Sequence, residues 1–466
     1  MSLLADAKGE AAPIGGRLPD GLEWFDIGHS DYTALIDADT AFWSLVRTDE
    51  ASRVLADGEL VRQWQDKRES FAEEMELLRF NLKPSAVYFN PTERCNLDCA
   101  YCYIPRDMRK SGEHMSRETL LDAMERLHAY FSSIMPPDRK PQIIFHGAEP
   151  MLNRDAMFEA IAQYGDRFRF GVQTNATLLD ESAIAFLTSH GCGIGLSLDA
   201  PIEAVADRSR KRWNGDSVFA STLTAIDRLK GYAGFNVICT MNRENIDQLV
   251  PMVEFLHERE VPACMLNFVR CTQPGGRDSW VEDAVVSKAY LAALDRTHAL
   301  FRETGRKLVV ANFANILISI LAPTARRLMC DISPCGGGRS FFALAPDGTL
   351  FPCSEFIGLP DFAGGNLFTD RIEDVLETPP FKLVTGRKVE DIAKCAVCAV
   401  RHFCGSPCPA EAFEANGGMD KIGAYCDAYL DQAKYAFRLI ADGIEADYLW
   451  DGWDDGTETT FGFGGC

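Results

Sequence analysis

Residues 86–103 read Ala-Val-Tyr-Phe-Asn-Pro-Thr-Glu-Arg-Cys-Asn-Leu-Asp-Cys-Ala-Tyr-Cys-Tyr, a short apolar run followed closely by three cysteines. The apolar run is typical of a buried strand. Cys95, Cys99 and Cys102 have the spacing C-x3-C-x2-C. Three such thiolates could bind three irons of a 4Fe–4S cube, which normally has four cysteine ligands, and leave the fourth iron without a protein ligand. An open coordination position is typical of catalytic metal sites, whereas the alternative interpretation is a zinc knuckle.

Downstream of this motif, short apolar runs alternate with helical patterns. Six β/α units in this order predict a parallel sheet with helical crossovers. Ligand sites in such sheets form at the carboxyl ends of the strands, which is where the three cysteines fall. The expected strands are 86–89, 142–145, 168–173, 193–198, 235–240 and 263–269, and the expected helices are 116–131, 153–164, 180–189, 216–230, 245–258 and 282–304.

The chain divides into four segments of different character. The first contains a charged helical pattern over 60–78, and the second ends in an apolar stretch, 308–323, that is too short for a membrane span and predicts a buried helix. The last segment begins with a helical pattern and ends in an acidic, glycine-rich tail that we expect to be mobile. The segments are an N-terminal extension (1–84), the β/α core (85–323), a cysteine-rich region (324–430) and a C-terminal helix with its tail (431–466).

Composition and charge exclude several classes of protein. The 466 residues include 47 basic and 68 acidic side chains, a formal net charge of −21, which argues against a nucleic-acid partner. The start lacks the basic and apolar regions of a signal peptide, and we expect no membrane association. Sixteen cysteines without a secretion signal indicate metal or redox chemistry in a reducing cytoplasm rather than disulfides.

Polar groups follow three successive expected strands. They are His146-Gly147-Ala148-Glu149-Pro150, Gln173-Thr174-Asn175 and Ser197-Leu198-Asp199. Each group alone is also compatible with an ordinary turn or cap. Together at one rim they suit a ribose and an amino acid, and Arg208 or Arg210 could pair a carboxylate.

These features resemble the radical S-adenosylmethionine (SAM) enzymes, through the three-cysteine motif, a Gly-Gly-Glu-Pro-like element at 147–150, and the Thr-Asn and Ser-x-Asp elements. The resemblance implies a partial (β/α)6 TIM-type barrel in which SAM chelates the open iron of the cluster held by Cys95, Cys99 and Cys102. Two departures are Ala148 and Ala200, where glycine is common. The implied SAM contacts are Tyr101 beside the adenine, Gly147, Ala148 and Glu149 at the amino group, Thr174, Asn175, Ser197 and Asp199 along the ribose and methionyl side, Arg210 near the carboxylate, and Leu266 on the sixth strand.

Eight more cysteines lie within residues 330–426, and the run from Cys395 reads C-x2-C-x5-C-x3-C-x17-C. Eight thiolates can fill two four-cysteine sites, for iron–sulfur clusters or for zinc. The spacing is similar to the SPASM extension of radical SAM enzymes, which carries two auxiliary 4Fe–4S clusters. The remaining cysteines Cys192, Cys239, Cys264 and Cys271 are expected to act as small buried hydrophobes, and Cys466 has no assigned role. The resemblance implies Cys330, Cys335, Cys353 and Cys408 as ligands of the first auxiliary cluster, and Cys395, Cys398, Cys404 and Cys426 as ligands of the second.

The resemblance also implies the chemistry. A reduced cluster would cleave SAM to a 5′-deoxyadenosyl radical that takes a hydrogen atom from an unactivated C–H bond. SPASM relatives act mostly on peptides and proteins, so the expected substrate is a ribosomally made precursor peptide or protein, and the product a thioether or other side-chain crosslink. The expected partners are this substrate and an electron donor such as flavodoxin or ferredoxin, and residues 20–80 could help hold a leader peptide.

Three alternatives remain open. A related subgroup of enzymes oxidises Cys or Ser of sulfatases to formylglycine. These enzymes carry an Asp that acts as a base directly after the cysteine that matches Cys353. This chain has Ser354 at that position, followed by Glu355. Glu355 is therefore a candidate catalytic base. An enzyme acting on tRNA is disfavoured by the acidic charge. A non-catalytic zinc or iron–sulfur adaptor would explain the later cysteines, but not three ligands followed by a SAM-like rim.

Overall fold

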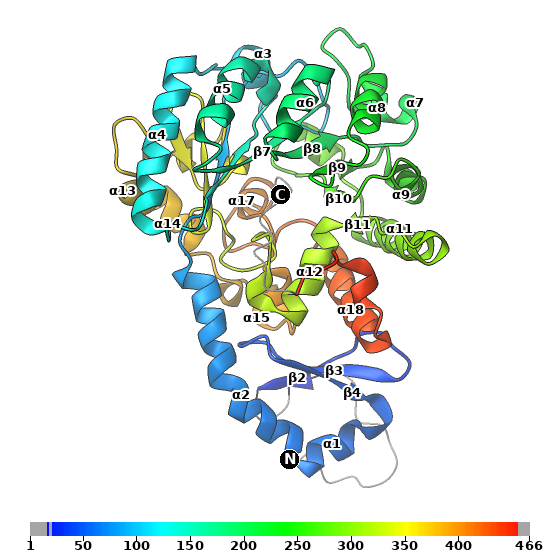
Figure 1. Cartoon of the computed structure of the whole chain (residues 1–466). Helices are drawn as coiled ribbons and strands as arrows, with labels where there is room; N and C mark the ends of the chain where they lie inside the picture. The colour runs from blue at the N-terminus through cyan, green and yellow to red at the C-terminus, as the bar shows by residue number, and fades with distance from the viewer. Residues whose placement is uncertain (1–15, 18–20, 455–466) are drawn as a thin grey trace.

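The computed structural model describes residues 16–17 and 21–454. It contains a ten-stranded sheet surrounded by helices and a separate four-stranded sheet at the other end of the molecule (Figure 1). The end of the acidic tail, which was expected to be mobile, and Cys466 lie outside the described residues.

Six parallel strands in sequence order form the core, as predicted. Strands β5 and β6 are buried at every residue, because a parallel sheet covered by helices requires apolar runs rather than alternation. The strands are β5 (Ala86–Phe89), β6 (Gln142–Phe145), β7 (Arg169–Thr174), β8 (Gly193–Ser197), β9 (Phe235–Met241) and β10 (Ala263–Phe268).

Helices lie between these strands in sequence and outside them in space (Figure 1). Their starts follow from side-chain caps: Ser116 accepts from the Thr119 N–H, and Asp180 from the Ala183 N–H. The predicted helices are confirmed as α4 (Arg117–Ile134), α5 (Arg154–Tyr164), α6 (Glu181–Ser189), α8 (Phe219–Arg228), α9 (Leu249–Glu258) and α11 (Asp283–Thr304), with α3 (Arg106–Ser111), α7 (Glu203–Ser209) and α10 (Pro274–Asp278) as additional short helices.

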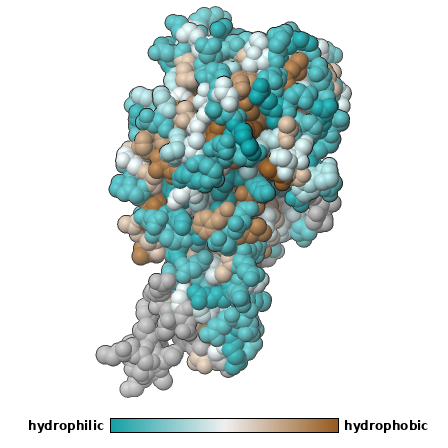
Figure 2. Space-filling view, turned by 90° about the vertical axis from the view of Figure 1, so that its left-hand side faces the viewer, coloured by the Kyte–Doolittle hydropathy of each residue, from teal (hydrophilic) through white to brown (hydrophobic). Residues whose placement is uncertain are grey.

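The apolar stretch 308–323 is a buried element, as expected. It begins as strand β11 (Val309–Val310), parallel to β10, and continues as helix α12 (Ala311–Leu321), almost all of which is buried. No helix of the described residues is long and apolar enough to cross a membrane. Hydrophilic side chains predominate on the face in Figure 2, with hydrophobic ones in separate patches.

The cysteine-rich region continues the core sheet, which the sequence did not predict. Strand β12 (Phe341–Leu344) is fully buried and pairs in parallel with β5, and β13 (Thr349–Phe351) and β14 (Gly365–Asn366) follow as antiparallel strands. Its loops therefore lie against the core. Its short helices are α13 (Ile372–Leu376), α14 (Pro379–Thr385), α15 (Ala393–Ala396), α16 (Arg401–Cys404) and α17 (Pro409–Asn416).

The N-terminal extension contains a four-stranded antiparallel sheet and the expected charged helix. Hydrogen bonds hold this sheet against the rest of the molecule; among them, Trp43 Nε1 donates to the Ile320 carbonyl oxygen at 2.7 Å, and Arg438 Nη1 to the Ile27 carbonyl oxygen at 2.7 Å. Its elements are β1 (Gly16–Arg17), β2 (Leu22–Phe25), β3 (Tyr32–Asp37), β4 (Trp43–Arg47), α1 (Ala51–Asp57) and α2 (Glu59–Glu76), and Arg438 belongs to α18 (Cys426–Asp442).

Candidate active site

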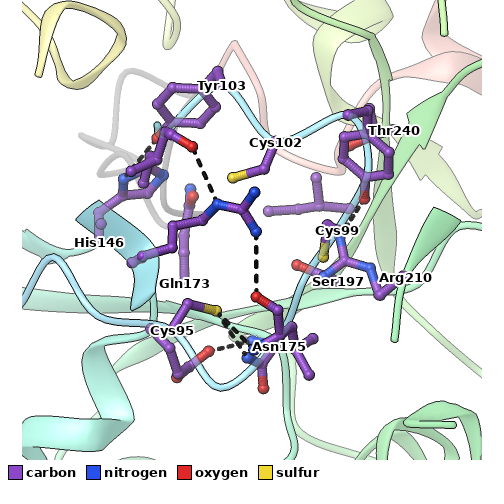
Figure 3. Close-up of a pocket in the computed structure, with 18 of the residues that line it drawn as sticks. Cys95, Cys99, Cys102, Tyr103, His146, Gln173, Asn175, Ser197, Arg210 and Thr240 are labelled. Atoms are coloured by element: carbon purple, nitrogen blue, oxygen red, sulfur yellow. Dashed lines mark hydrogen bonds between the residues drawn. The ribbon is translucent and has the colours of Figure 1, made fainter. Parts of the chain in front are cut away.

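The three cysteines of the first motif line one pocket at the carboxyl ends of the strands, together with Asn175, Ser197 and Arg210 (Figure 3). Their loop is fixed by backbone hydrogen bonds, from Cys95 N to the Arg109 carbonyl oxygen at 2.8 Å and from Ala100 N to the Ser209 carbonyl oxygen at 2.9 Å. The sequence therefore places all three cysteines in the lining of one cavity.

Hydrogen bonds from two side chains also hold this loop. The buried Arg109 donates from Nη1 to the Leu97 carbonyl oxygen at 3.2 Å and from Nε to the Ile104 carbonyl oxygen at 3.1 Å. Trp213 Nε1 donates to the Cys95 carbonyl oxygen at 2.8 Å. Neither Arg109 nor Trp213 was predicted, because nothing in the motif itself points to either.

The donor chemistry of this set fits an iron–sulfur cube with one open iron. Burial raises the pKa of the Cys99 thiol to about 11, against the opposing charge of Arg210, and it also raises the pKa values of Cys95 and Cys102. Three thiols that line one cavity and whose pKa values are raised in this way would be neutral on their own. Iron supplies the positive charge that stabilises them as thiolates.

The backbone geometry at 147–150 explains why this chain can carry Ala148, one of its two departures from the family pattern. Gly147 has φ +102°, and a Cβ there would lie 2.5 Å from Asn90 Cγ, so glycine is required. Ala148 does not have a positive φ. Alanine is therefore tolerated at the second position without backbone strain, and both residues line the pocket.

Glu149 links this element to the third strand. Its Oε1 accepts from Thr174 Oγ1 at 2.7 Å and from Met151 N at 3.0 Å, and its Oε2 accepts from Asn175 N at 2.8 Å. Burial raises the pKa of Glu149 to about 6, although these hydrogen bonds oppose the rise. Asn175 in turn places Nδ2 3.8 Å from Cys95 Sγ. The predicted residues of the second and third strand ends thus form one network beside the cluster site.

Asp199, Arg210 and Tyr101 form a buried group at the other side of the pocket. Arg210 Nε donates to Asp199 Oδ2 at 3.1 Å, and the Tyr101 hydroxyl donates to the same oxygen at 2.6 Å, so the proximity of Arg210 to the SAM carboxylate stays a prediction. Tyr101 and Arg210 line the pocket, whereas Asp199 and the fully buried Leu266 do not. Direct contact with SAM stays a prediction for all the proposed SAM-binding residues.

Two further charged side chains line the pocket, Glu355 from the cysteine-rich region and Arg270 from the core. Glu355 lines it and lies 3.6 Å from Arg270, measured from Oε1 to Nε. Burial raises the pKa of Glu355 to about 7, although Arg270 opposes the rise. Arg270 follows strand β10 by two residues, so its position after a strand is the signal that sequence reasoning missed. Tyr103 and His146, whose hydroxyl oxygen and Nδ1 lie 3.3 Å apart, also line the pocket.

The eight later cysteines fall into two regions. Cys395, Cys398, Cys404 and Cys426 line one cavity of about 230 Å³, and their role as ligands of one cluster stays a prediction. A Cβ at Gly337 would lie 3.4 Å from both Cys335 Sγ and Cys353 Cβ, so these two cysteines lie close together. Cys408 is buried. Cys330 is half-buried and forms a disulfide, so its proposed role as an iron ligand requires the reduced thiol. Of the other cysteines, Cys192, Cys239, Cys264 and Cys271 are buried, as expected.

Two family models match the chain. Residues 89–256 match the radical SAM superfamily, and residues 335–399 match SPASM, an iron–sulfur cluster-binding domain. These matches cover the three-cysteine motif with four of the strands that follow it, and the first part of the cysteine-rich region.

Curated relatives match most of the chain. An uncharacterised protein of Archaeoglobus fulgidus is 37% identical over 402 residues, which cover 86% of this chain and 90% of that protein. The cysteine-type anaerobic sulfatase-maturating enzyme of Clostridium perfringens is 23% identical over 378 residues, which cover 77% of this chain and 98% of that enzyme.

Solved structures share the fold. Native anSMEcpe with bound AdoMet superposes with a TM-score of 0.68 at 20% identity, covering 78% of this chain and 100% of that one. SuiB of Streptococcus suis bound to precursor peptide SuiA superposes with a TM-score of 0.55 at 12% identity, covering 88% of this chain and 99% of that one.

Proposed function

Because the chain belongs to the radical SAM superfamily and carries a SPASM iron–sulfur domain, we propose that it is a peptide maturase that installs a thioether or other side-chain crosslink in a ribosomally made precursor. Its cofactors are SAM, a SAM-binding 4Fe–4S cluster and auxiliary clusters, and together they supply the chemistry that removes a hydrogen atom from an unactivated C–H bond. The reducing cytoplasm suits its many thiols.

The observation that carries this proposal is the composition of a single pocket. The three cysteines line it together with Glu149, Thr174 and Asn175 of the core, and so do Arg270 and Glu355. A substrate side chain in this pocket would be shielded from bulk water by the core and by the cysteine-rich region. Such exclusion protects a reactive intermediate from side reactions.

The N-terminal sheet offers a place for the rest of the peptide. Strand β4 is the last strand of its sheet. Asp37 N donates to the Phe42 carbonyl oxygen and Thr48 N to that of Asp31, so Ser44 and Val46 bond to β3 and Leu45 directs its backbone groups away from it. In the part of the chain that the structure describes, these outward groups have no backbone partner. An extended leader peptide could add there as a further strand.

A second candidate function is the oxidation of a sulfatase cysteine or serine to formylglycine. The relative from Clostridium perfringens supports it, and so does Glu355, whose carboxylate faces the pocket. Those enzymes carry an Asp that acts as a base at the position of Ser354, so Glu355 would have to be the base in this chain. This substitution is why crosslinking is the preferred proposal.

The assignment of the cluster site is tested by replacing Cys95, Cys99 and Cys102 together with alanine. Reductive SAM cleavage should stop, because no ligands remain for the SAM-binding cube, while about eight of about twelve irons should stay in the auxiliary clusters. Iron and sulfide analysis of anaerobically purified protein, with chromatographic detection of 5′-deoxyadenosine, measures both. Formation of 5′-deoxyadenosine by this variant would show that the site is wrong.

The two candidate reactions are separated by mass spectrometry of products. The protein is co-expressed with peptides from small open reading frames beside its gene, and separately with a sulfatase fragment that contains the target cysteine or serine. A peptide that loses two hydrogens without gaining an aldehyde indicates a crosslink. A product that reacts with a hydrazide reagent indicates formylglycine and would replace the preferred proposal.

A further inference from the structure

A buried arginine lies between the two sets of auxiliary cysteines. Arg387 is 6% exposed and donates four hydrogen bonds, all to neutral oxygen atoms. Nε bonds the Met419 carbonyl oxygen at 2.9 Å, Nη1 the Ser406 carbonyl oxygen at 2.8 Å, and Nη2 both Ser406 Oγ at 3.0 Å and the Lys421 carbonyl oxygen at 2.9 Å. In the described ranges 16–17 and 21–454, no carboxylate forms an ion pair with it.

The loop that Arg387 holds carries one proposed ligand of each cluster. Ser406 lies between Cys404, assigned to the second cluster, and Cys408, assigned to the first. Ser406 has φ +47° and Cys408 has φ +56°, a conformation that costs free energy unless contacts hold it. The bonds from Arg387 to both oxygens of Ser406 are contacts of this kind.

Arg387 also reaches the first cluster set through its own backbone. Its carbonyl oxygen accepts from Ser333 Oγ at 3.0 Å, two residues before Cys335, and Ser333 Oγ accepts from Val389 N at 2.9 Å. Burial lowers the pKa of Arg387, and the nearby thiols of Cys335, Cys395, Cys408 and Cys404 oppose this effect. These four cysteines come from both sets, so the guanidinium lies within electrostatic reach of both.

A buried cation without a carboxylate partner is costly, whereas a cube held by four thiolates is an anion. We propose that Arg387 is a positioning residue whose charge is balanced by the auxiliary clusters themselves and which, in return, raises their reduction potentials. The physical reason is that reduction adds negative charge beside the guanidinium. A fixed positive charge stabilises the reduced form more than the oxidised form.

This proposal rests on the proposed cluster ligands, and it is tested in the anaerobically reconstituted full-length protein. Arg387→Gln removes the charge and keeps part of the hydrogen bonding, while Arg387→Lys keeps the charge. The matched control is Arg79→Gln: Arg79 is 7% exposed and also bonds the Ser333 segment, but its charge is already paired with Glu390 at 2.7 Å.

Potentiometric titration followed by EPR, in a Cys95, Cys99 and Cys102 triple-alanine background, reports the auxiliary clusters alone. We expect Arg387→Gln to shift at least one midpoint to more negative potential, with Arg387→Lys and Arg79→Gln close to the parent. Unchanged midpoints in Arg387→Gln at full iron content would overturn the proposal.

The iron content of each variant is also measured, so that the test still decides if a variant loses a cluster. If Arg387→Gln binds less iron, Arg387→Lys should retain more, because charge rather than shape is required. Equal iron loss in both variants would show that Arg387 acts only through its hydrogen bonds and would refute the proposed charge effect. Loss of all auxiliary iron in the triple-alanine parent would instead contradict the cluster assignment of the proposed function, which separates the two failures.

Discussion

Gly147 and Ala148 show how two neighbouring small residues differ in what they permit. Gly147 combines φ +102° with an approach to Asn90 that leaves no room for a Cβ, whereas Ala148 has ordinary backbone geometry. Gly147→Ala should therefore cost about 1–2 kcal/mol for the backbone alone, with the contact to Asn90 in addition. We expect a lower Tm and weaker SAM binding, measured by thermal denaturation and by calorimetric titration of the reconstituted protein.

The control for that substitution is Ala148→Gly, which restores the common family residue and should change SAM affinity little. If both variants bound SAM as the parent does, the close backbone approach at 147–149 would have no part in SAM binding. A loss confined to Ala148→Gly would contradict the backbone geometry described above.

The predictable part of the site consists of residues that follow strands. Cys95, Glu149 and Asn175 were expected in one pocket because the carboxyl ends of parallel strands meet at one edge, whereas the pairing of Arg210 with Asp199 was not predicted. Arg109 could not be found this way: it bonds carbonyl oxygens of a loop, and nothing in a sequence marks a carbonyl oxygen as needing a donor. Arg270 was missed although it follows a strand.

At the scale of elements, the two strand groups outside the β/α core escaped prediction. Strand β12 is a run of only four residues among turn residues and cysteines, and its partner β5 precedes it by some 250 residues of chain, so no local pattern marks the pairing. The N-terminal strands are two to six residues long and bury one side against α12 and α18, which follow much later. Short strands of this kind depend on tertiary partners rather than on local periodicity.

The free edge of β4 makes a prediction about peptide recognition. Leu45→Pro removes an outward N–H without breaking a bond to β3, so the sheet should persist, while an added strand loses about one hydrogen bond, worth about 1 kcal/mol. We expect peptide affinity to fall about fivefold, with SAM cleavage in the absence of peptide unchanged. Fluorescence anisotropy with a labelled precursor peptide measures the affinity.

Two variants control this prediction. Leu45→Ala removes most of the same side chain but keeps the N–H, and Ser44→Pro removes a bond inside the sheet. If Leu45→Ala weakened binding as much as Leu45→Pro, the side chain rather than the strand edge would be responsible. If Leu45→Pro, Leu45→Ala and Ser44→Pro all bound the peptide as tightly as the parent protein does, this edge would be excluded as the binding place.

At the scale of the whole molecule, the cysteine-rich region is joined to the core through one shared sheet but depends on metal for its own interior. It carries the thiols of Cys395, Cys404 and Cys408, whose pKa values burial raises, so without iron they would be neutral and only weakly held together. Metal binding to such a region is part of its folding free energy. The core strands, in contrast, are stabilised by apolar side chains such as Val87, Ile143 and Val172.

Removal of the clusters should therefore loosen the molecule unevenly. Hydrogen–deuterium exchange, compared between the reconstituted protein and protein treated with an iron chelator, should rise strongly in peptides from 330–340 and 395–426. Peptides from β6, β7 and β9 should change little, and those from β12 should lie between, because β12 is held on one side by β5. Cys192→Ala replaces a core cysteine that belongs to no proposed ligand set, and it serves as the control for the loss of a thiol that binds no cluster. A uniform rise across the core strands would mean that cluster loading and core stability form a single cooperative unit, and the division into a self-sufficient core and a metal-dependent region would be wrong.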